Sequence, residues 1–418
     1  MEIIKRDVYL NKLIERRENE LIKIITGIRR CGKSYLLDPI FKNYLLASGV
    51  EEDHIIKLEL DSIENKEYTE PKNLYKYVMD KIKDEKMYYI LLDEIQKVTD
   101  FESVLNSFLR KRNLDVYVTG SNSKFLSSDV VTEFRGRGDE IRVFPLSYSE
   151  FKGAYQGDER NAFNEYMTYG GMPYILSRKT EEAKSSYLND LFQNTYLNDI
   201  VERNNIQKDG KLDAIVNMVA SSIGSLTNPN KIKDTFKSNN INDITVPTIN
   251  NYLNYLEDAF LINKAERFDI RGKKYISTPS KYYFSDVGLR NARLNFRQQE
   301  ETHLMENIIY NELLVRGYNV DVGVVEINEE DKNGNKIRKQ IEVDFVCNQG
   351  SKRYYVQSAF AIPDKEKMEQ EQRPFNYIQD SFKKIIVVRD NIKLWRNDEG
   401  TVIMGIEEFL LNKDSLNL

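Results

Sequence analysis

The stretch 21-LIKIITGIRRCGKSYLL-37 joins an apolar run to a glycine-containing turn and then to a second apolar pattern. The β-branched residues Ile22, Ile24 and Ile25 are typical of a buried strand. After Ser34 the apolar residues recur at helical spacing, at Tyr35, Leu36, Leu37, Ile40, Phe41, Tyr44 and Leu45. The stretch therefore predicts a strand, a loop and a helix, the unit from which a parallel α/β sheet is built.

The loop itself has the spacing G-x-x-x-x-G-K-S/T. Glycines allow successive backbone N–H groups to face inward, and together with the helix N-terminus they make a cradle for an anion. Lys33 would bring its charge to the β- and γ-phosphates of ATP, and the Ser34 hydroxyl would ligate Mg²⁺. Arg29 and Arg30 either help to bind phosphate or point to solvent. The predicted nucleotide-binding residues are Gly27, Ile28, Arg29, Arg30, Cys31, Gly32, Lys33, Ser34 and Tyr35.

A second apolar run, 87-MYYILLDEIQKV-98, ends in two acids. On a strand of a parallel sheet, Asp93 would lie at the carboxyl edge beside the phosphate loop and hold Mg²⁺ with Ser34. Glu94 would polarise the attacking water as a general base. The alternative is an Asp-Glu pair that caps a helix after a core strand.

A third strand-like run, 114–119, precedes a polar turn. Ser121 or Asn122 in that turn would sense the γ-phosphate, and we choose Ser121; the alternative is a solvated turn without a role.

Two arginines flank a glycine in 133-EFRGRGDEIRVFPL-146. Arg135 or Arg137, of which we choose Arg137, would reach the nucleotide of a neighbouring subunit as an arginine finger, which implies a homo-oligomer. The alternative is an exposed basic turn.

The segments GIRRCGKS, YYILLDEIQ, VTGSNS, FRGRGDEIRVFPLSYSEF and YGGMP together resemble the prokaryotic AAA-type ATPases that carry a C-terminal domain of unknown function 4143. The resemblance covers nearly the whole chain. Gly136-Arg137, followed by an apolar strand and Pro-Leu-Ser, is more diagnostic than the phosphate loop. A further segment, 279-PSKYYFSDVGLRN-291, matches at Lys281, Asp286, Gly288 and Leu289. The resemblance implies an α/β ATPase domain related to the signal-transduction ATPases.

The order of predicted elements divides the chain into four domains. Residues 1–155 alternate strand and helix and form the P-loop ATPase domain, a parallel α/β sheet. Residues 156–205 form a helical lid or linker, in which 169-YGGMP-173 either bends the lid over the nucleotide or is a surface loop. Residues 206–292 form a winged-helix-like domain, and residues 293–413 form an α/β domain like the PD-(D/E)xK restriction endonucleases.

The winged-helix prediction rests on three helices, near 212–220, 231–236 and 247–261, followed by a β-wing around Gly272. Lys273 and Lys274 would contact DNA phosphates. The third helix has few basic residues, so a protein-binding or structural role is the alternative.

The nuclease-like prediction rests on a helix acid, Glu306, and a strand acid, Asp344. Active members carry Glu-x-Lys on the next strand to complete the Mg²⁺ site. Tyr355 and Gln357 stand at those places here, so we expect an inactive domain. Whether it retains metal binding stays open.

The composition agrees with a cytoplasmic protein of 418 residues, 40% hydrophobic and 30% charged. No apolar run approaches the length of about 18 residues that would span a membrane. With only two cysteines, the fold is not held together by a framework of disulfides. The net charge of −5 is not typical of a protein that binds nucleic acid over its whole surface. We expect Mg²⁺-dependent ATP hydrolysis coupled to conformational change of C-terminal domains that contact DNA or protein. The alternatives are a nucleotide-gated switch with negligible turnover and an ATP-regulated nuclease.

Overall fold

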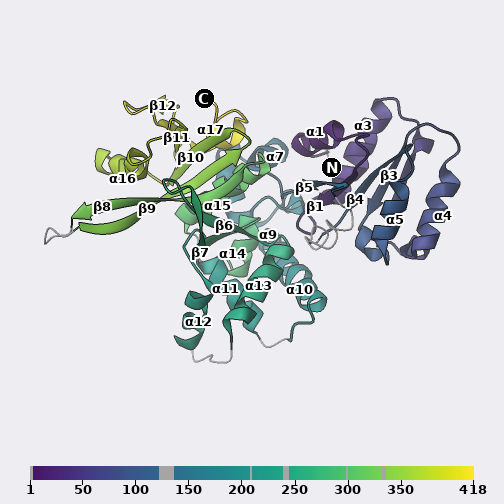
Figure 1. The fold of residues 1–418 in the computed structure, drawn as a ribbon, viewed down its shortest axis with the longest axis horizontal. Helices are drawn as coiled ribbons and strands as arrows, with labels where there is room; N and C mark the ends of the chain where they lie inside the picture. Colours follow the sequence, from purple (N-terminus) through teal and green to yellow (C-terminus); the bar gives the residue numbers. More distant parts are fainter. Residues whose placement is uncertain (1–2, 122–135, 208–209, 239–243, 298–299, 331–335) are drawn as a thin grey trace. The chain divides into compact units, whose positions relative to one another are not determined.

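The computed structural model describes residues 3–121, 136–207, 210–238, 244–297, 300–330 and 336–418 (Figure 1). The chain divides into an N-terminal unit, Met1–Pro145 with Asp258–Phe260, and a C-terminal unit, Leu146–Glu257 with Leu261–Leu418. The sequence places the end of the first domain at residue 155, and the N-terminal unit ends ten residues earlier apart from the short segment at 258–260. The three other predicted domains fall within the C-terminal unit, apart from residues 258–260.

The N-terminal unit contains a parallel sheet of five strands in the order β2-β3-β4-β1-β5, which confirms the parallel α/β sheet predicted for this part of the chain. Every residue of β1, β3 and β4 is buried, which explains their nearly unbroken apolar sequences. Because the chain runs to opposite sides of β1, the carboxyl end of β1 is the topological switch point, where ligands bind in such sheets. The strands are β1 (Ile22–Thr26), β2 (Ile55–Glu59), β3 (Tyr88–Asp93), β4 (Leu114–Thr119) and β5 (Gly138–Arg142).

The helices of this unit pack apolar side chains against the sheet; Leu74 and Val78 of one helix and Leu105 and Phe108 of another belong to one core. The predicted helix after the phosphate loop is interrupted at Asp38, whose φ of −144° and ψ of 118° are extended. The cause is the next residue, a proline, which disfavours helical angles in the residue before it. The helices are α1 (Asp7–Glu15), α2 (Lys33–Tyr35), α3 (Lys42–Ala47), α4 (Pro71–Lys81) and α5 (Phe101–Phe108).

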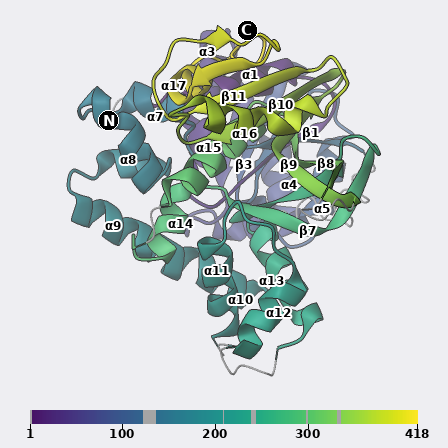
Figure 2. The ribbon, with the colours of Figure 1, turned by 90° about the vertical axis from the view of Figure 1, so that its left-hand side faces the viewer.

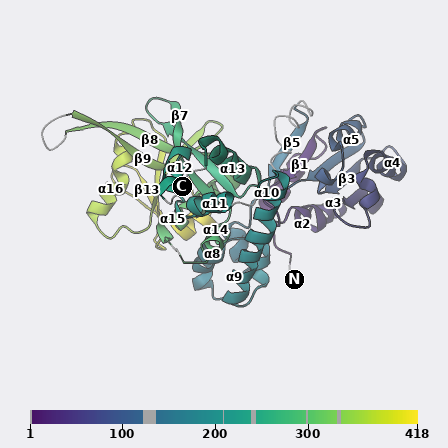
Figure 3. The same ribbon diagram turned by 90° about the horizontal axis from the view of Figure 1, so that it is seen from below.

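The C-terminal unit contains a mixed sheet of eight strands in the order β12-β13-β11-β10-β9-β8-β6-β7. Its strand β6 pairs in parallel with β8, so one sheet crosses the predicted domain boundary at 292/293 and joins the predicted wing to the predicted nuclease-like domain. Figures 1 and 3 show the hairpin of β8 and β9 extending beyond the rest of this unit. The strands are β6 (Ile262–Asp269), β7 (Lys274–Phe284), β8 (Asn319–Glu330), β9 (Lys336–Gln349), β10 (Lys352–Ala359), β11 (Lys383–Val388), β12 (Trp395–Arg396) and β13 (Val402–Gly405).

The helices of the C-terminal unit include the three predicted between residues 206 and 261. Figure 2 shows these three, α11 to α13, gathered together and away from β10 and β11. The elements lie where the sequence predicts them, while their assignment to a winged helix stays a prediction. The helices are α7 (Tyr148–Ala154), α8 (Ala162–Tyr169), α9 (Glu181–Asp190), α10 (Asn198–Arg203), α11 (Lys211–Ser221), α12 (Pro229–Ser238), α13 (Val246–Asp258), α14 (Val287–Arg293), α15 (Glu301–Val315), α16 (Lys365–Asn376) and α17 (Ile406–Leu411).

Two of the family-like motifs, YGGMP and SDVGL, are joined in this unit by a buried aspartate. Asp286 caps α14 by accepting a hydrogen bond from the Leu289 N–H at 3.0 Å, and it also accepts one from the Gly171 N–H at 2.6 Å. A Cβ atom at Gly170 would lie 2.2 Å from Asp286 Oδ1, and one at Gly288 would lie 2.0 Å from the Tyr169 carbonyl oxygen. Burial raises the pKa of Asp286 to about 6. These residues therefore hold the end of α8 against the start of α14.

Candidate functional site

The loop between β1 and α2 has the backbone that its glycines predict. Gly27 and Gly32 have φ angles of 138° and 103°, which residues with side chains rarely adopt. A Cβ atom at Gly27 would lie 2.0 Å from the carbonyl oxygen of Val143, which follows β5. Cys31 donates its S–H to the same carbonyl, at 3.4 Å. The loop is thus packed tightly against the chain after β5 at a point where only glycine fits.

Lys33 is buried, with 4% of its surface exposed, and its ammonium group lies inside the loop. Nζ donates to the carbonyl oxygens of Gly27, at 2.9 Å, and Ile28, at 3.1 Å. Among the described residues no carboxylate forms an ion pair with it, so only carbonyl dipoles balance its charge. A buried ammonium without a counter-ion is unfavourable. The loop therefore offers a fixed positive charge to an anion such as phosphate.

The other predicted loop residues differ in what they expose. Ile28 and Cys31 are buried, so their contact with a ligand would come from the backbone. Arg29 is half-buried, and Arg30, which has a φ of 64°, is exposed. Ser34 and Tyr35 are also exposed, in the first turn of α2. The Ser34 hydroxyl is thus accessible, as a metal ligand beside the phosphates must be.

Asp93 and Glu94 are held by a threonine that the sequence analysis missed. Strand β4 lies between β1 and β3, and it ends at Thr119. The Thr119 hydroxyl donates to Asp93 Oδ1 at 2.5 Å and accepts from the Glu94 N–H at 2.9 Å. Gln96 donates to the Glu94 carboxylate. The two acids at the end of β3 and just after it are therefore oriented by β4, the strand that separates β3 from β1 and the phosphate loop.

The threonine could have been recognised as the hydroxyl residue that follows the apolar run Val116 to Val118 at the end of a strand. The sequence points instead to Ser121, which is buried two residues further on. Asn122 lies outside the described residues. A second unpredicted contact joins the end of β1 to β5, where the Thr26 hydroxyl donates to Glu140 Oε1 at 2.6 Å.

Arg137 lies at the opposite edge of the sheet from the phosphate loop. It precedes β5, and its carbonyl oxygen accepts from the Ile22 N–H at 2.9 Å, at the start of β1. The loop begins after Thr26, so the length of β1, about 13 Å at the usual rise per residue, separates the two positions. The Arg137 backbone is therefore remote from the phosphate loop of its own chain. Arg135 lies outside the described residues.

The metal ligands on offer are oxygen atoms, as Mg²⁺ requires. Ser34 and Asp93 provide two ligands, and Mg²⁺ in nucleotide sites takes most of the others from phosphates and water. In the described part of the chain, no group of three or more His, Cys, Asp or Glu side chains is placed to hold a metal ion. The site therefore fits a metal that arrives with a nucleotide.

A second cluster of charge lies in the C-terminal unit and contains both predicted nuclease acids. Lys281 of β7 is buried, with 3% exposed, and its Nζ lies 2.8 Å from Glu306 Oε1 and 2.6 Å from Glu342 Oε1. The Tyr283 hydroxyl donates to the same Glu306 oxygen at 2.6 Å. Asp344 accepts from the Ser358 N–H at 2.8 Å. We call Lys281, Tyr283, Glu306, Glu342 and Asp344 the acidic cluster.

The two buried acids of this cluster, Asp344 and Glu306, have pKa values that are shifted in opposite directions. Burial and the Glu306 charge raise the pKa of Asp344 well above its ordinary value. Burial opposes the ionised form of Glu306 as well, but the Lys281 ammonium outweighs it and lowers the pKa of Glu306. Burial alone would lower the pKa of Lys281, and the surrounding carboxylates raise it instead. An ammonium from the protein thus neutralises the acids that a metal would need.

The two predicted replacements of Glu-x-Lys have different surroundings. Tyr355 donates its hydroxyl to Asp380 at 2.5 Å and belongs to the core beneath α16. Gln357 accepts from the Asp344 N–H at 3.3 Å and donates to Glu371 at 3.3 Å. Only Gln357 is therefore next to the acidic cluster, and the lysine of that cluster comes from a strand that the sequence analysis did not connect with it.

The strand order, the glycine loop and Lys33 define the N-terminal unit as a P-loop NTPase-type α/β unit. In agreement, a family model described as an AAA domain matches residues 19–152. A second family model, domain of unknown function 8612, matches residues 160–300. This corrects the expectation of domain 4143: the residues behind that expectation, at 169–173 and 279–291, lie inside the match to domain 8612.

An uncharacterized protein of Haemophilus influenzae is 34% identical over 412 residues, which cover 97% of this chain and 96% of the relative. The chain belongs to the same family as that protein. An uncharacterized protein of Methanocaldococcus jannaschii is 28% identical over 419 residues, which cover 96% of this chain and 86% of the relative.

Solved structures give weaker similarities. The Aeropyrum pernix Orc1 protein in complex with DNA is 12% identical with a TM-score of 0.30, covering 70% of this chain and 92% of that chain. Cdc6p of Pyrobaculum aerophilum is 10% identical with a TM-score of 0.29, covering 73% and 96%. TM-scores this low do not support any conclusion about the function of this chain. None of the described helices is long and apolar enough to cross a membrane.

Proposed function

We propose that the N-terminal unit binds ATP with Mg²⁺ and hydrolyses it. The observation that carries this proposal is the buried Lys33 ammonium, which lies inside a glycine loop and whose partners among the described residues are two carbonyl oxygens. The match to an AAA domain over residues 19–152 supports the same activity. ATP would bind with its phosphates in the loop, at the carboxyl end of β1.

The roles of the residues follow from their placement. Lys33 would exchange its carbonyl partners for phosphate oxygens, which return far more electrostatic stabilisation. Ser34 and Asp93 would hold Mg²⁺, which when bound neutralises charge that develops on the phosphates. Glu94 would accept a proton from the attacking water, and Thr119 would keep Asp93 and Glu94 in position. Arg137 would act on a neighbouring subunit in a homo-oligomer.

Hydrolysis would be coupled to the C-terminal unit, which we propose contacts a DNA or protein partner. The four predicted domains keep their roles in this proposal: ATPase, lid, winged helix and nuclease-like module. A nucleotide-gated switch with negligible turnover is the competing function. It would use the same loop without effective proton transfer to Glu94.

An ATP-regulated nuclease is a weaker candidate because of Lys281. A metal at Glu306 and Asp344 would have to displace an ammonium that forms two ion pairs there. The raised pKa of Asp344 further favours its protonated form, which is a poor metal ligand. The acidic cluster therefore supports a structural role.

The test is ATP binding and steady-state turnover by the wild type and by Glu94→Gln. Glu64→Gln, an exposed acid on the same unit, is the matched control. We expect Glu94→Gln to bind ATP while turnover falls at least about 100-fold, as is usual for loss of a general base. Binding by the wild type with no measurable turnover would establish the switch instead. Absence of ATP binding by the wild type would refute both.

A further inference from the structure

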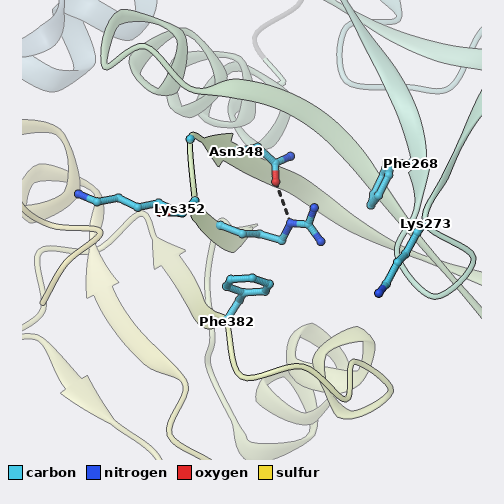
Figure 4. A pocket seen from close by; sticks show the side chains of 8 residues that line it. Phe268, Lys273, Asn348, Lys352 and Phe382 are labelled. Atoms are coloured by element: carbon cyan, nitrogen blue, oxygen red, sulfur yellow. Dashed lines mark hydrogen bonds between the residues drawn. The ribbon is translucent and has the colours of Figure 1, made fainter.

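A basic hollow of about 380 Å³ lies on the C-terminal unit, where two turns of the mixed sheet meet. The turn between β6 and β7 contributes Lys273, and the start of β10 contributes Lys352 and Arg353. The rest of the lining is Phe268, Asn348, Gly350, Ser351 and Phe382 (Figure 4). In sequence the two turns are about 80 residues apart, and the pairing of β6 with β8 brings them into one sheet.

The charge of this hollow has one sign. Among the described residues that line it, three are cationic and none is acidic. No ion pair of Lys273, Lys352 or Arg353 is found within the described part of the chain, whereas Lys281, the cation of the acidic cluster, forms two. Asp321, a carboxylate near enough to interact with the Arg353 charge, accepts a hydrogen bond from the Tyr275 hydroxyl at 3.2 Å. Because the chain carries a net charge of −5, three unpaired cations in one hollow mark a site for an anion.

Arg353 is oriented before any ligand binds. Its Nε donates to Asn348 Oδ1 at 2.7 Å, the bond that Figure 4 marks at Asn348. Its guanidinium carbon lies 5.4 Å from the Phe268 ring centre and 5.3 Å from that of Phe382. The Tyr355 hydroxyl also lies within hydrogen-bonding reach of the guanidinium. A planar fork of donors is thus held in place, with N–H groups left over to bind phosphate oxygens.

The cations are arranged in a row. Figure 4 shows Lys352 and Lys273 on opposite sides of the Asn348 amide to which Arg353 is bonded. One small anion would engage Arg353 alone, while an extended polyanion could reach all three. Exposed aromatic rings flank the row: Tyr275 is 60% exposed and Phe382 is 39% exposed. Interleaved cations and exposed rings are what unpaired nucleotides require, because the rings stack with bases while the cations bind the backbone.

We propose that this hollow binds single-stranded nucleic acid through its phosphates and stacked bases. Arg353 holds one phosphate, Lys273 and Lys352 hold the phosphates on either side, and Phe382 or Tyr275 stacks with a base. The inference rests on the proposed function, in which the C-terminal unit contacts a DNA or protein partner. Binding itself is independent of ATP, so it can be tested separately.

The test is fluorescence anisotropy of labelled oligothymidine and oligouridine of about 20 nucleotides, without ATP, at about 50 mM salt. The main variant is Lys273→Ala with Lys352→Ala, because both side chains are exposed and their removal cannot disturb the core. We expect affinity to fall at least about tenfold. The slope of log affinity against log salt should become shallower by about 1.4, since each phosphate contact on a single strand contributes about 0.7. Lys365→Ala with Arg160→Ala removes two exposed cations elsewhere on the same unit and should change neither quantity.

A second variant, Phe382→Ala, should weaken binding at least about fivefold with an unchanged salt slope, because stacking is not electrostatic. Equal affinity of the wild type and the Lys273→Ala/Lys352→Ala variant would overturn the proposal. Equal affinity for a duplex of the same length, or for polyglutamate, would overturn the assignment to single strands. In each case ATP binding at Lys33 would be untouched, so failure here is distinguishable from failure of the ATPase proposal.

Discussion

Two buried lysines, Lys33 in the phosphate loop and Lys281 in the acidic cluster, are equally hidden from water but have opposite partners. Lys33 is bonded to two carbonyl oxygens, and Lys281 is paired with two carboxylates. The first charge remains available to a ligand, while the second is neutralised within the fold. Burial of a charged side chain therefore does not by itself indicate a ligand-binding site. A buried cation bonded to neutral carbonyl oxygens can still bind an anion, whereas one paired with carboxylates stabilises the fold.

The largest effect should come from Lys33→Met. We expect ATP turnover to fall by at least about 100-fold, because the fixed cation of the loop is lost. The free energy of unfolding should change by no more than about 1 kcal/mol, since only neutral hydrogen bonds are removed. Turnover assays and urea denaturation of the two proteins measure both effects. Lys72→Met, at an exposed position on α4, is the control, and a Lys33→Met protein that retains turnover would break the comparison.

Lys281→Met should show the reverse pattern. Removing the cation leaves Glu306 and Glu342 without their partner, which for a buried pair destabilises by about 3–5 kcal/mol. Turnover per folded molecule should stay within about twofold of wild type, because the variant leaves the phosphate loop intact. Adding Glu306→Gln to Lys281→Met should restore part of the stability, since it removes the stranded charge. Urea denaturation of Lys281→Met, Glu306→Gln and the double variant gives the coupling free energy between the two side chains. A coupling free energy of zero would mean that the ion pair contributes nothing to stability.

Thr119→Val tests whether the phosphate site depends on an orienting contact. It removes the hydrogen bonds to Asp93 and to the Glu94 N–H while keeping the side-chain volume. We expect turnover to fall about tenfold, because Glu94 is no longer held near the attacking water, with ATP affinity changed less than about threefold. Turnover and equilibrium ATP binding are measured on the same preparations. A fall in ATP affinity with unchanged turnover at saturating ATP would contradict this role of Thr119.

Asp344→Asn should have the smallest effect on stability at acidic pH. Burial and the Glu306 charge raise the pKa of Asp344, which favours its protonated form in the folded protein, and a neutral amide resembles that form. At a pH low enough to protonate Asp344 in the unfolded chain as well, the unfolding free energies should differ by less than about 1 kcal/mol. A raised pKa contributes stability at low pH that is lost as pH rises through the folded-state value. The wild type should therefore lose stability relative to Asp344→Asn as the pH increases, and parallel pH profiles of the two would show that Asp344 is ionised.

The phosphate site could be predicted because its residues are adjacent in sequence. Gly27, Gly32 and Lys33 lie on one loop, and the apolar runs on either side define its strand and helix. Thr119 could not be predicted because its bond to Asp93 depends on the order of strands, which places β4 between β1 and β3. The interruption at Asp38 was open to prediction from the proline that follows it.

The C-terminal unit was predicted element by element, but its connections were not. The acids Glu306 and Asp344 were recognised, and the structure brings them together. Lys281 was missed because it reaches them from β7, in a segment that the sequence assigns to another domain. The parallel pairing of β6 with β8 joins those segments, and such distant pairing leaves no local pattern in the sequence.

The most direct test of the central claim is the shift in melting temperature that Mg²⁺ and ATP produce. A ligand that binds only the folded state raises the melting temperature, and the rise grows with the logarithm of the ligand concentration relative to Kd. We predict a clear rise for the wild type, a similar rise from a lower starting temperature for Lys281→Met, and no rise for Lys33→Met. An equal rise for Lys33→Met and wild type would mean that ATP binds elsewhere, and would contradict the assignment of the phosphate loop.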